Sequence, residues 1–157
     1  MIVGAVYFYH LTRQPVDVTL ATLIGKARGQ GWRILVRGTA TDRLEWLDQK
    51  LWLGGDESFL PHGVSGGPYD KDQPVLLTTS AENANEANCV MSIDGAELTA
   101  EEINAADRCC ILFDGFDEGA VQHARVQWKT LTDAGCAAQY WSEESGNWQK
   151  KAEKAAS

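Results

Sequence analysis

The chain of 157 residues lacks an excess of basic side chains: 14 lysines and arginines against 22 aspartates and glutamates give a net charge of −8. Binding to a phosphate backbone depends on clustered lysine and arginine, so we expect any connection with DNA to run through another protein. There is also no stretch near the roughly 20 apolar residues that a membrane-spanning helix needs. Residues 1–4 lead into a predicted strand without a charged leader. The sequence predicts a cytoplasmic protein of one domain.

The four cysteines lack the spacing of a metal or redox site. Cys89, Cys109, Cys110 and Cys136 form no C-x-x-C motif, and no histidine pair lies beside them. Each lies in an apolar run, and neighbouring residues of a strand, such as Cys109 and Cys110, point to opposite faces. We expect buried thiols that act as small hydrophobic side chains, and no metal site.

A nucleotide-binding glycine motif is also missing. Residues 10–17, which connect the first predicted strand to the first helix, contain no glycine, and neither G-x-G-x-x-G nor G-x-x-x-x-G-K-[ST] occurs in the chain. Asp17 would place negative charge where a pyrophosphate has to lie at the helix N-terminus. We therefore expect no cofactor.

Hydrophobic periodicity predicts an alternation of strands and helices. Strands are expected at residues 3–9, 33–37, 75–79, 89–93, 108–113 and 136–141, and helices at about 16–28, 42–53, 99–106 and 117–134. This alternation, with nearly continuous apolar strands, is typical of an α/β, three-layer Rossmann-like fold: a mostly parallel central sheet with helices on both faces. We expect one domain at residues 1–148 and a flexible tail at 149–157, either a solvated helix end or disordered.

Two aromatic side chains bracket the longest irregular stretch, residues 54–73. The helix before it buries Leu44, Leu47 and Leu51 on one stripe, and at about 100° per residue Trp52 points away from that stripe. Trp52 and Phe59 then flank an acidic, glycine-rich segment that leads into proline. We interpret the pair as a docking surface, the alternative being that both rings fold over the loop.

The late helix presents two cations, Arg125 and Lys129, at i and i+4 with Trp128 at the border of the buried stripe. In an acidic protein this combination suits an acidic peptide that carries a hydrophobic residue. An amphipathic helix with Trp128 as edge packing explains the pattern equally well.

Acidic residues after the central predicted strand raise the possibility of catalysis. Asp114 and Asp117 lie where α/β proteins often bind ligands, which would suit a small nucleotide- or Mg²⁺-dependent enzyme. Helix capping by Asp117 is the simpler reading. His10, His62 and His123 stand outside any known ligand or base motif, so His62 is read as a loop hydrogen-bonder and His123 as a solvated helix residue. We expect no catalytic residues.

Four stretches resemble the chi subunit of bacterial DNA polymerase III, an accessory of the clamp loader. They are Leu51-Trp52-x4-Glu57-Ser58-Phe59-Leu60-Pro61-His62, Tyr7-Phe8-Tyr9, Ala124-Arg125-x2-Trp128-Lys129, and the segment from Tyr140-Trp141 to Trp148. The resemblance spans nearly the whole chain, and it implies a Rossmann-like fold and a non-catalytic accessory subunit of the polymerase III holoenzyme, a nucleotidyltransferase complex.

The resemblance also implies partners. It assigns Arg125, Trp128 and Lys129 to the C-terminal tail of the single-stranded DNA-binding protein, an acidic segment that ends in phenylalanine and a carboxylate. It assigns Trp52 and Phe59 to the psi subunit or an equivalent clamp-loader partner, or to a repair helicase that competes for this place. Trp128 departs from the tyrosine usual in the family, which removes one hydroxyl but retains an apolar wall.

Overall fold

The computed structural model describes residues 4–52, 63–66 and 70–155. The elements follow in this order: β1 (Ala5–Leu11), α1 (Val16–Gly29), β2 (Ile34–Arg37), α2 (Thr41–Trp52), β3 (Gly63–Val64), the 3-10 turn η1 (Asp70–Asp72), β4 (Val75–Thr78), β5 (Cys89–Ser92), α3 (Ala100–Ala105), β6 (Arg108–Asp114), α4 (Glu118–Asp133), β7 (Ala137–Ser142) and β8 (Gln149–Lys154). The described strands form one eight-stranded sheet in the order β3-β4-β2-β5-β6-β1-β7-β8. Every neighbouring pair is parallel except β7 and β8. The expected α/β fold with a mostly parallel sheet is confirmed.

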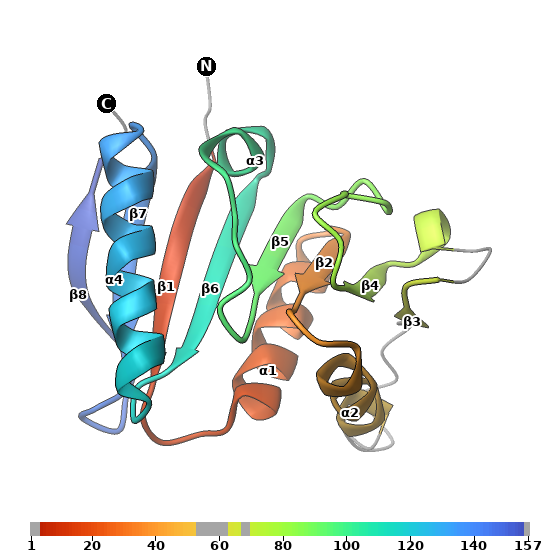
Figure 1. Ribbon diagram of the computed structural model, residues 1–157, viewed down its shortest axis with the longest axis horizontal. Coiled ribbons are helices and arrows are strands. Elements are labelled where there is room, and N and C mark those ends of the chain that lie inside the picture. The colour runs from red at the N-terminus through yellow and green to blue at the C-terminus, as the bar shows by residue number, and fades with distance from the viewer. Residues whose placement is uncertain (1–3, 53–62, 67–69, 156–157) are drawn as a thin grey trace.

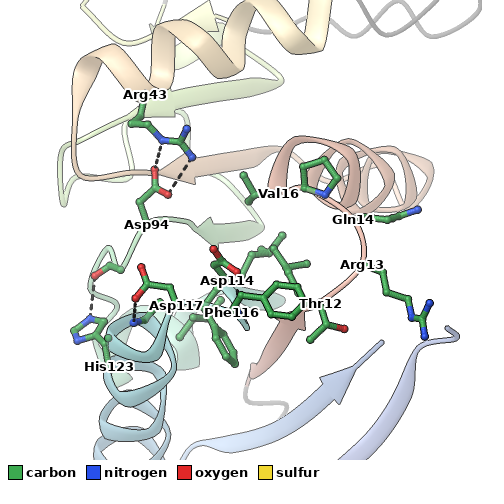
Figure 2. Close-up of a pocket in the computed structure, with 18 of the residues that line it drawn as sticks. Thr12, Arg13, Gln14, Val16, Arg43, Asp94, Asp114, Phe116, Asp117 and His123 are labelled. Carbon is green, nitrogen blue, oxygen red and sulfur yellow. Dashed lines mark hydrogen bonds and ion pairs between the residues drawn. The ribbon is translucent and has the colours of Figure 1, made fainter. Parts of the chain in front are cut away.

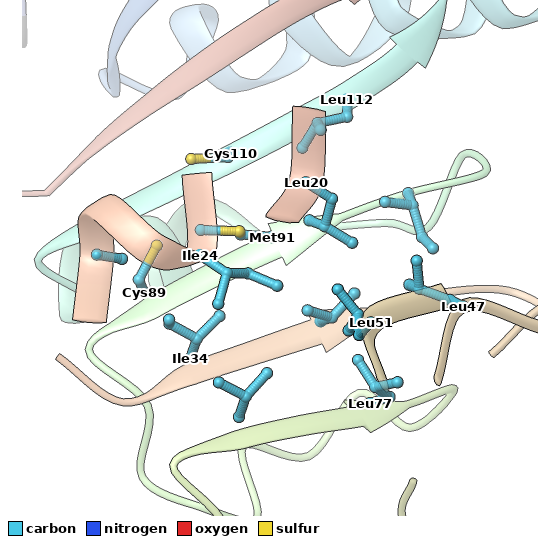
Figure 3. Packing of buried hydrophobic residues seen from close by; sticks show 14 of the residues in the cluster. Leu20, Ile24, Ile34, Leu47, Leu51, Leu77, Cys89, Met91, Cys110 and Leu112 are labelled. Atoms are coloured by element: carbon cyan, nitrogen blue, oxygen red, sulfur yellow. The ribbon is translucent and has the colours of Figure 1, made fainter. Parts of the chain in front are cut away.

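Helices cover the sheet on both faces (Figure 1). One face packs against α1 and α2 around a core that includes Leu20 and Leu47, which Figure 3 shows from close by. The other face packs against α3 and α4 around Ile103 and Leu131. This three-layer arrangement explains why the central strands are apolar along their whole length, since both of their faces are buried.

Adjacent cysteines of β6 illustrate how the strand divides its side chains between the two cores. Cys110 lies in the α1 and α2 core, whereas Cys109 lies in the α3 and α4 core. All four cysteines are free and buried, and burial raises the pKa of the Cys109 thiol to about 12. Their predicted role as small buried hydrophobic side chains is confirmed.

Helix α2 buries the predicted stripe. Leu44, Leu47 and Leu51 are at most 5% exposed and belong to the core under α1 and α2. The short helix α3 begins with the predicted capping box, in which the Thr99 hydroxyl accepts from the Glu102 backbone N–H and the Glu102 carboxylate accepts from the Thr99 N–H. Local sequence signals therefore placed these two helices correctly.

A buried arginine ties the carboxyl end of β2 to the surrounding loops. Arg37 is 3% exposed, and its guanidinium lies 2.7 Å from the Glu102 carboxylate. It also donates to the carbonyl oxygens of Ser80, Ala81 and Glu97. A fully desolvated charge is tolerated only with such a set of partners, so Arg37 fixes the loop after β4 and the start of α3 against the sheet.

The segment after Trp148 differs from the prediction. Gln149–Lys154 pair antiparallel with β7 as the edge strand β8, so a helix end or a disordered chain is wrong for these residues. The misreading has a physical cause, because every β8 residue is exposed and the strand has no apolar face that sequence periodicity could detect. Its lysines suit an edge strand, since charged side chains oppose pairing with another chain.

Candidate binding surfaces

The connections after β1 and β6 leave the sheet in opposite directions and open a cavity between them. β1 and β6 are neighbours, but α1 carries the chain from β1 to β2, and α4 carries it from β6 to β7 on the far side of β1. In α/β folds this switch point at the carboxyl ends of the strands is the usual ligand site. Here it holds a cavity of about 820 Å³, which Figure 2 shows. Phe116, which lines the cavity, is 80% exposed.

The two aspartates at this cavity are engaged with the backbone. The Asp114 carboxylate accepts from the Phe116 N–H at 2.9 Å, which shapes the turn after β6. The Asp117 carboxylate accepts from the Ala120 N–H at 3.2 Å and caps α4, as predicted. Gly115 lies between them because a Cβ there would collide with the His10 ring. Both carboxylates therefore stabilise the turn into α4.

The turn between β1 and α1 is already filled by an anion of the protein itself. One carboxylate oxygen of Glu143 accepts from the backbone N–H groups of Thr12, Arg13 and Gln14 at 2.8–3.0 Å. Burial opposes ionisation of Glu143, but these three N–H groups and the charge of Arg13 outweigh it and lower its pKa. Oriented N–H groups of this kind form an anion site. The turn that is glycine-rich in nucleotide-binding Rossmann domains is thus closed here by a carboxylate of the protein itself.

The far rim of the cavity is closed by polar side-chain contacts. Arg43 of α2 pairs with Asp94 at 3.1 Å. His123 of α4 lies 2.7 Å from Glu97 and 3.1 Å from the Gly95 carbonyl oxygen, so its ring links α4 to the loop after β5 (Figure 2). His123 is thus a partly exposed helix residue, in line with the expectation of a solvated one, and it also holds the loop after β5. Within residues 4–52, 63–66 and 70–155, no group of three or more acidic, histidine or cysteine side chains is arranged to hold a metal ion.

The second surface lies on α4 and brings the three predicted site residues of this helix together with an aromatic cluster. Trp128 is half-buried, with its ring centroid 5.4 Å from that of Phe8 and 6.2 Å from that of Tyr140, both edge to face. The Tyr140 hydroxyl lies 2.7 Å from Nδ1 of His10, which anchors the ring from β7 against β1. Trp128 is thus held by packing on one side and open on the other. The sequence allowed Trp128 to be either part of a peptide-binding surface or edge packing of an amphipathic helix, and a half-buried ring is compatible with both.

The two predicted cations of this surface differ in whether an acidic side chain pairs with them. Arg125 is exposed and forms no ion pair with any residue that the structure describes, and it lies near enough to oppose part of the burial effect that raises the pKa of Tyr140. Lys129 is 78% exposed and is paired with Asp133 at 2.9 Å, one turn further along α4. A ligand anion would therefore meet Arg125 directly but would compete with Asp133 for Lys129.

The third surface follows α2. Trp52 is the last residue of α2, but its side chain, Phe59 and His62 lie outside the described residues. Their roles as docking residues and loop hydrogen-bonder stay predictions. From the long irregular stretch the structure describes β3, which pairs with β4, and η1.

Sequence reasoning missed two residues that shape these surfaces. Glu143 follows β7 without any motif, and its partners lie about 130 positions earlier in the chain, so only the pairing of β1 with β7 reveals it. Gln127 is 5% exposed on α4 and donates to the Ala96 carbonyl oxygen. An isolated polar residue within the apolar stripe of a helix was the available signal.

Together these features define a three-layer α/β protein whose turn between β1 and α1 is closed by its own Glu143 carboxylate, with an aromatic and cationic patch on its late helix. The family model for the DNA polymerase III chi subunit, HolC, matches residues 4–139, and the chain belongs to this family. Chi subunits are non-catalytic accessory subunits of DNA polymerase III. The resemblance inferred from the sequence is confirmed.

A curated relative supports the same assignment. It is described as a probable DNA polymerase III subunit chi from Rickettsia prowazekii (strain Madrid E), and it is 24% identical over 90 residues. The match covers 57% of this chain and 54% of the relative, so the chain spans about half the length of the relative it matches. None of the helices in the described part of the chain is long and apolar enough to cross a membrane.

Proposed function

We propose that this chain is an adaptor of the DNA polymerase III clamp loader that binds the C-terminal tail of single-stranded DNA-binding protein through α4. The single observation that carries this proposal is the exposed Arg125, which has no ion-pair partner among the residues that the structure describes, beside the anchored ring of Trp128. Trp128 supplies the apolar wall for the terminal phenylalanine of the tail, and Arg125 and Lys129 meet its carboxylates. Salt weakens this contact, because the charges are on the surface.

The second half of the proposal concerns the end of α2. Trp52 and Phe59 receive the psi subunit, an equivalent clamp-loader partner or a repair helicase. Support comes from family membership and from the position of Trp52 at the exit of α2. Because α4 and α2 lie on opposite faces of the sheet (Figure 1), the two partners can be held at once.

A pull-down from the native cell extract tests both surfaces together. Tagged wild type should capture single-stranded DNA-binding protein and a clamp-loader or helicase partner after nuclease treatment. Lys129→Glu should lose the first and keep the second, and Trp52→Ala should do the reverse. Lys71→Glu, an exposed charge reversal in η1, is the matched control. If Trp52→Ala still captures every partner of the wild type, the α2 assignment is wrong, and equal capture by Lys129→Glu excludes the α4 site.

The alternative, a nucleotide- or Mg²⁺-dependent enzyme at Asp114 and Asp117, predicts a different ligand response. Thermal stabilisation by Mg²⁺ with a nucleotide would support the enzyme, whereas stabilisation by an acidic tail peptide would support the adaptor. The adaptor is favoured because both aspartates bond to backbone N–H groups and Glu143 occupies the neighbouring turn.

A further inference from the structure

A second cavity, lined mostly by aromatic rings, lies on the face of the sheet opposite to α4. On that face α1 packs on β2 and β6, and α2 packs on β3 and β4. The half of the sheet formed by β1, β7 and β8 is therefore covered by α4 on one face. On the opposite face, α1 reaches only the border of this half of the sheet (Figure 1). A cavity of about 570 Å³ remains between α1 and this half of the sheet.

The walls of this cavity are mostly rings. Tyr9 and Trp148 meet edge to face with centroids 5.3 Å apart, and Trp141 and Trp32 complete the lining. Burial raises the pKa of Tyr9 far above its usual value, so this phenol stays neutral and behaves as part of an apolar wall. Beneath them lie the buried side chains of Cys89, Met91 and Cys110. A cavity of this size and composition can enclose an apolar side chain.

Two cations line the same cavity. The Arg108 guanidinium lies 4.6 Å from the centre of the Tyr7 ring and 5.4 Å from that of Trp32, and Lys26 projects from α1. Neither forms an ion pair with a carboxylate in the part of the chain that the structure describes. In a protein of net charge −8, an arginine that lies against two rings and has no acidic partner among the described residues can donate its N–H groups to the carboxylate of a ligand.

We propose that this cavity binds an acidic peptide segment of a partner protein, with an apolar side chain among Tyr9, Trp141 and Trp148 and a neighbouring carboxylate on Arg108. A short segment brings only a few negative charges to the two cations. A nucleic acid strand brings a phosphate with every nucleotide, which the net charge of the whole molecule repels. This site is separate from the α4 surface and does not depend on the function proposed above.

The test is a titration that follows the tryptophan indole N–H signals by NMR, assigned with single Trp→Phe variants. The probe is the peptide Glu-Leu-Glu-Phe-Glu-Glu with both ends blocked, so that it offers no terminal carboxylate. The signals of Trp141 and Trp148 should move in a saturable way, independently of any change in the signal of Trp128. Arg108→Gln should weaken binding about tenfold, since it removes a charge-assisted contact.

Lys26→Glu provides a second variant in case Arg108→Gln disturbs the packing of its rings, because Lys26 is exposed on α1. It should weaken the same titration, whereas Arg125→Gln should leave it unchanged. The proposal is overturned if no signal moves at millimolar peptide, if Trp128 responds in place of Trp141 and Trp148, or if a thymidine oligonucleotide moves these two signals at lower concentration than the peptide. A failure here leaves tail binding at α4 untouched, because that is measured with a separate peptide and separate variants.

Discussion

At the scale of single residues, Glu143 is the side chain whose substitution has the most directly predictable effect on stability. Its carboxylate accepts three backbone N–H groups at the turn before α1. Glu143→Gln keeps the shape but removes the charge, so the free energy of unfolding at pH 7 should fall by about 1–3 kcal/mol. Urea denaturation of the variant and the wild type measures the difference, with Glu144→Gln, an exposed neighbour, as control.

The same residue predicts a pH dependence. Because folding lowers the pKa of Glu143, its stabilising contribution is present above the pKa of the unfolded chain and is lost as the pH falls through the folded pKa. The stability gap between wild type and Glu143→Gln should therefore shrink below about pH 4.3, the usual range for glutamate. A gap that stays constant to the lowest pH at which both proteins fold would show that ionisation of Glu143 does not stabilise the turn.

Single residues were also the scale at which the sequence was least informative. Asp117 could be predicted as a cap because its partner Ala120 is three positions away. Glu143 and Arg37 could not, because their partners come from segments that only the folded sheet brings together. The same limit applies to Tyr140, whose ring completes the wall beside Trp128 from another element.

At the scale of elements, α4 carries a side chain that would compete with the proposed tail peptide for Lys129. Asp133 pairs with Lys129 on the exposed side of the helix. Asp133→Asn frees the Lys129 ammonium from this ion pair. The affinity for an acidic tail peptide should then rise about twofold, a change of the size expected from one surface ion pair. Isothermal titration at low and moderate salt measures this, with Glu101→Gln on α3 as a control that removes a distant charge. An unchanged or lower affinity would mean that Lys129 does not contact the peptide.

The edge strand β8 gives a second prediction at this scale. A chain that ends at Trp148 loses the β7 partner strand but no buried side chain, because β8 is exposed along its length. The free energy of unfolding should fall by only about 1–2 kcal/mol, but the uncovered edge of β7 should promote self-association. Sedimentation velocity of the truncated and full chains would measure this self-association. A truncated chain that stays monomeric at high concentration would contradict the proposal that β8 protects the edge of β7 from pairing with another chain.

At the scale of the whole molecule, much of the fold could be predicted from the sequence. Apolar strands such as β6 and the alternation of elements indicate a parallel sheet covered on both faces. Strand order and the antiparallel β8 could not be predicted, since periodicity reports the environment of a segment and not its neighbour. Of the candidate site residues, Arg125, Trp128 and Lys129 lie on one surface because they share helix α4, and their role in binding stays a prediction.

The central claim is that this acidic chi-family protein binds a partner's acidic tail at the α4 surface. Its most direct test is an isothermal titration of an acidic peptide ending in phenylalanine and a free carboxylate into wild type, Lys129→Glu and the control Lys71→Glu. The account predicts saturable binding to wild type and control that weakens as salt is raised, and about tenfold lower affinity for Lys129→Glu. Equal affinity of all three proteins would contradict it.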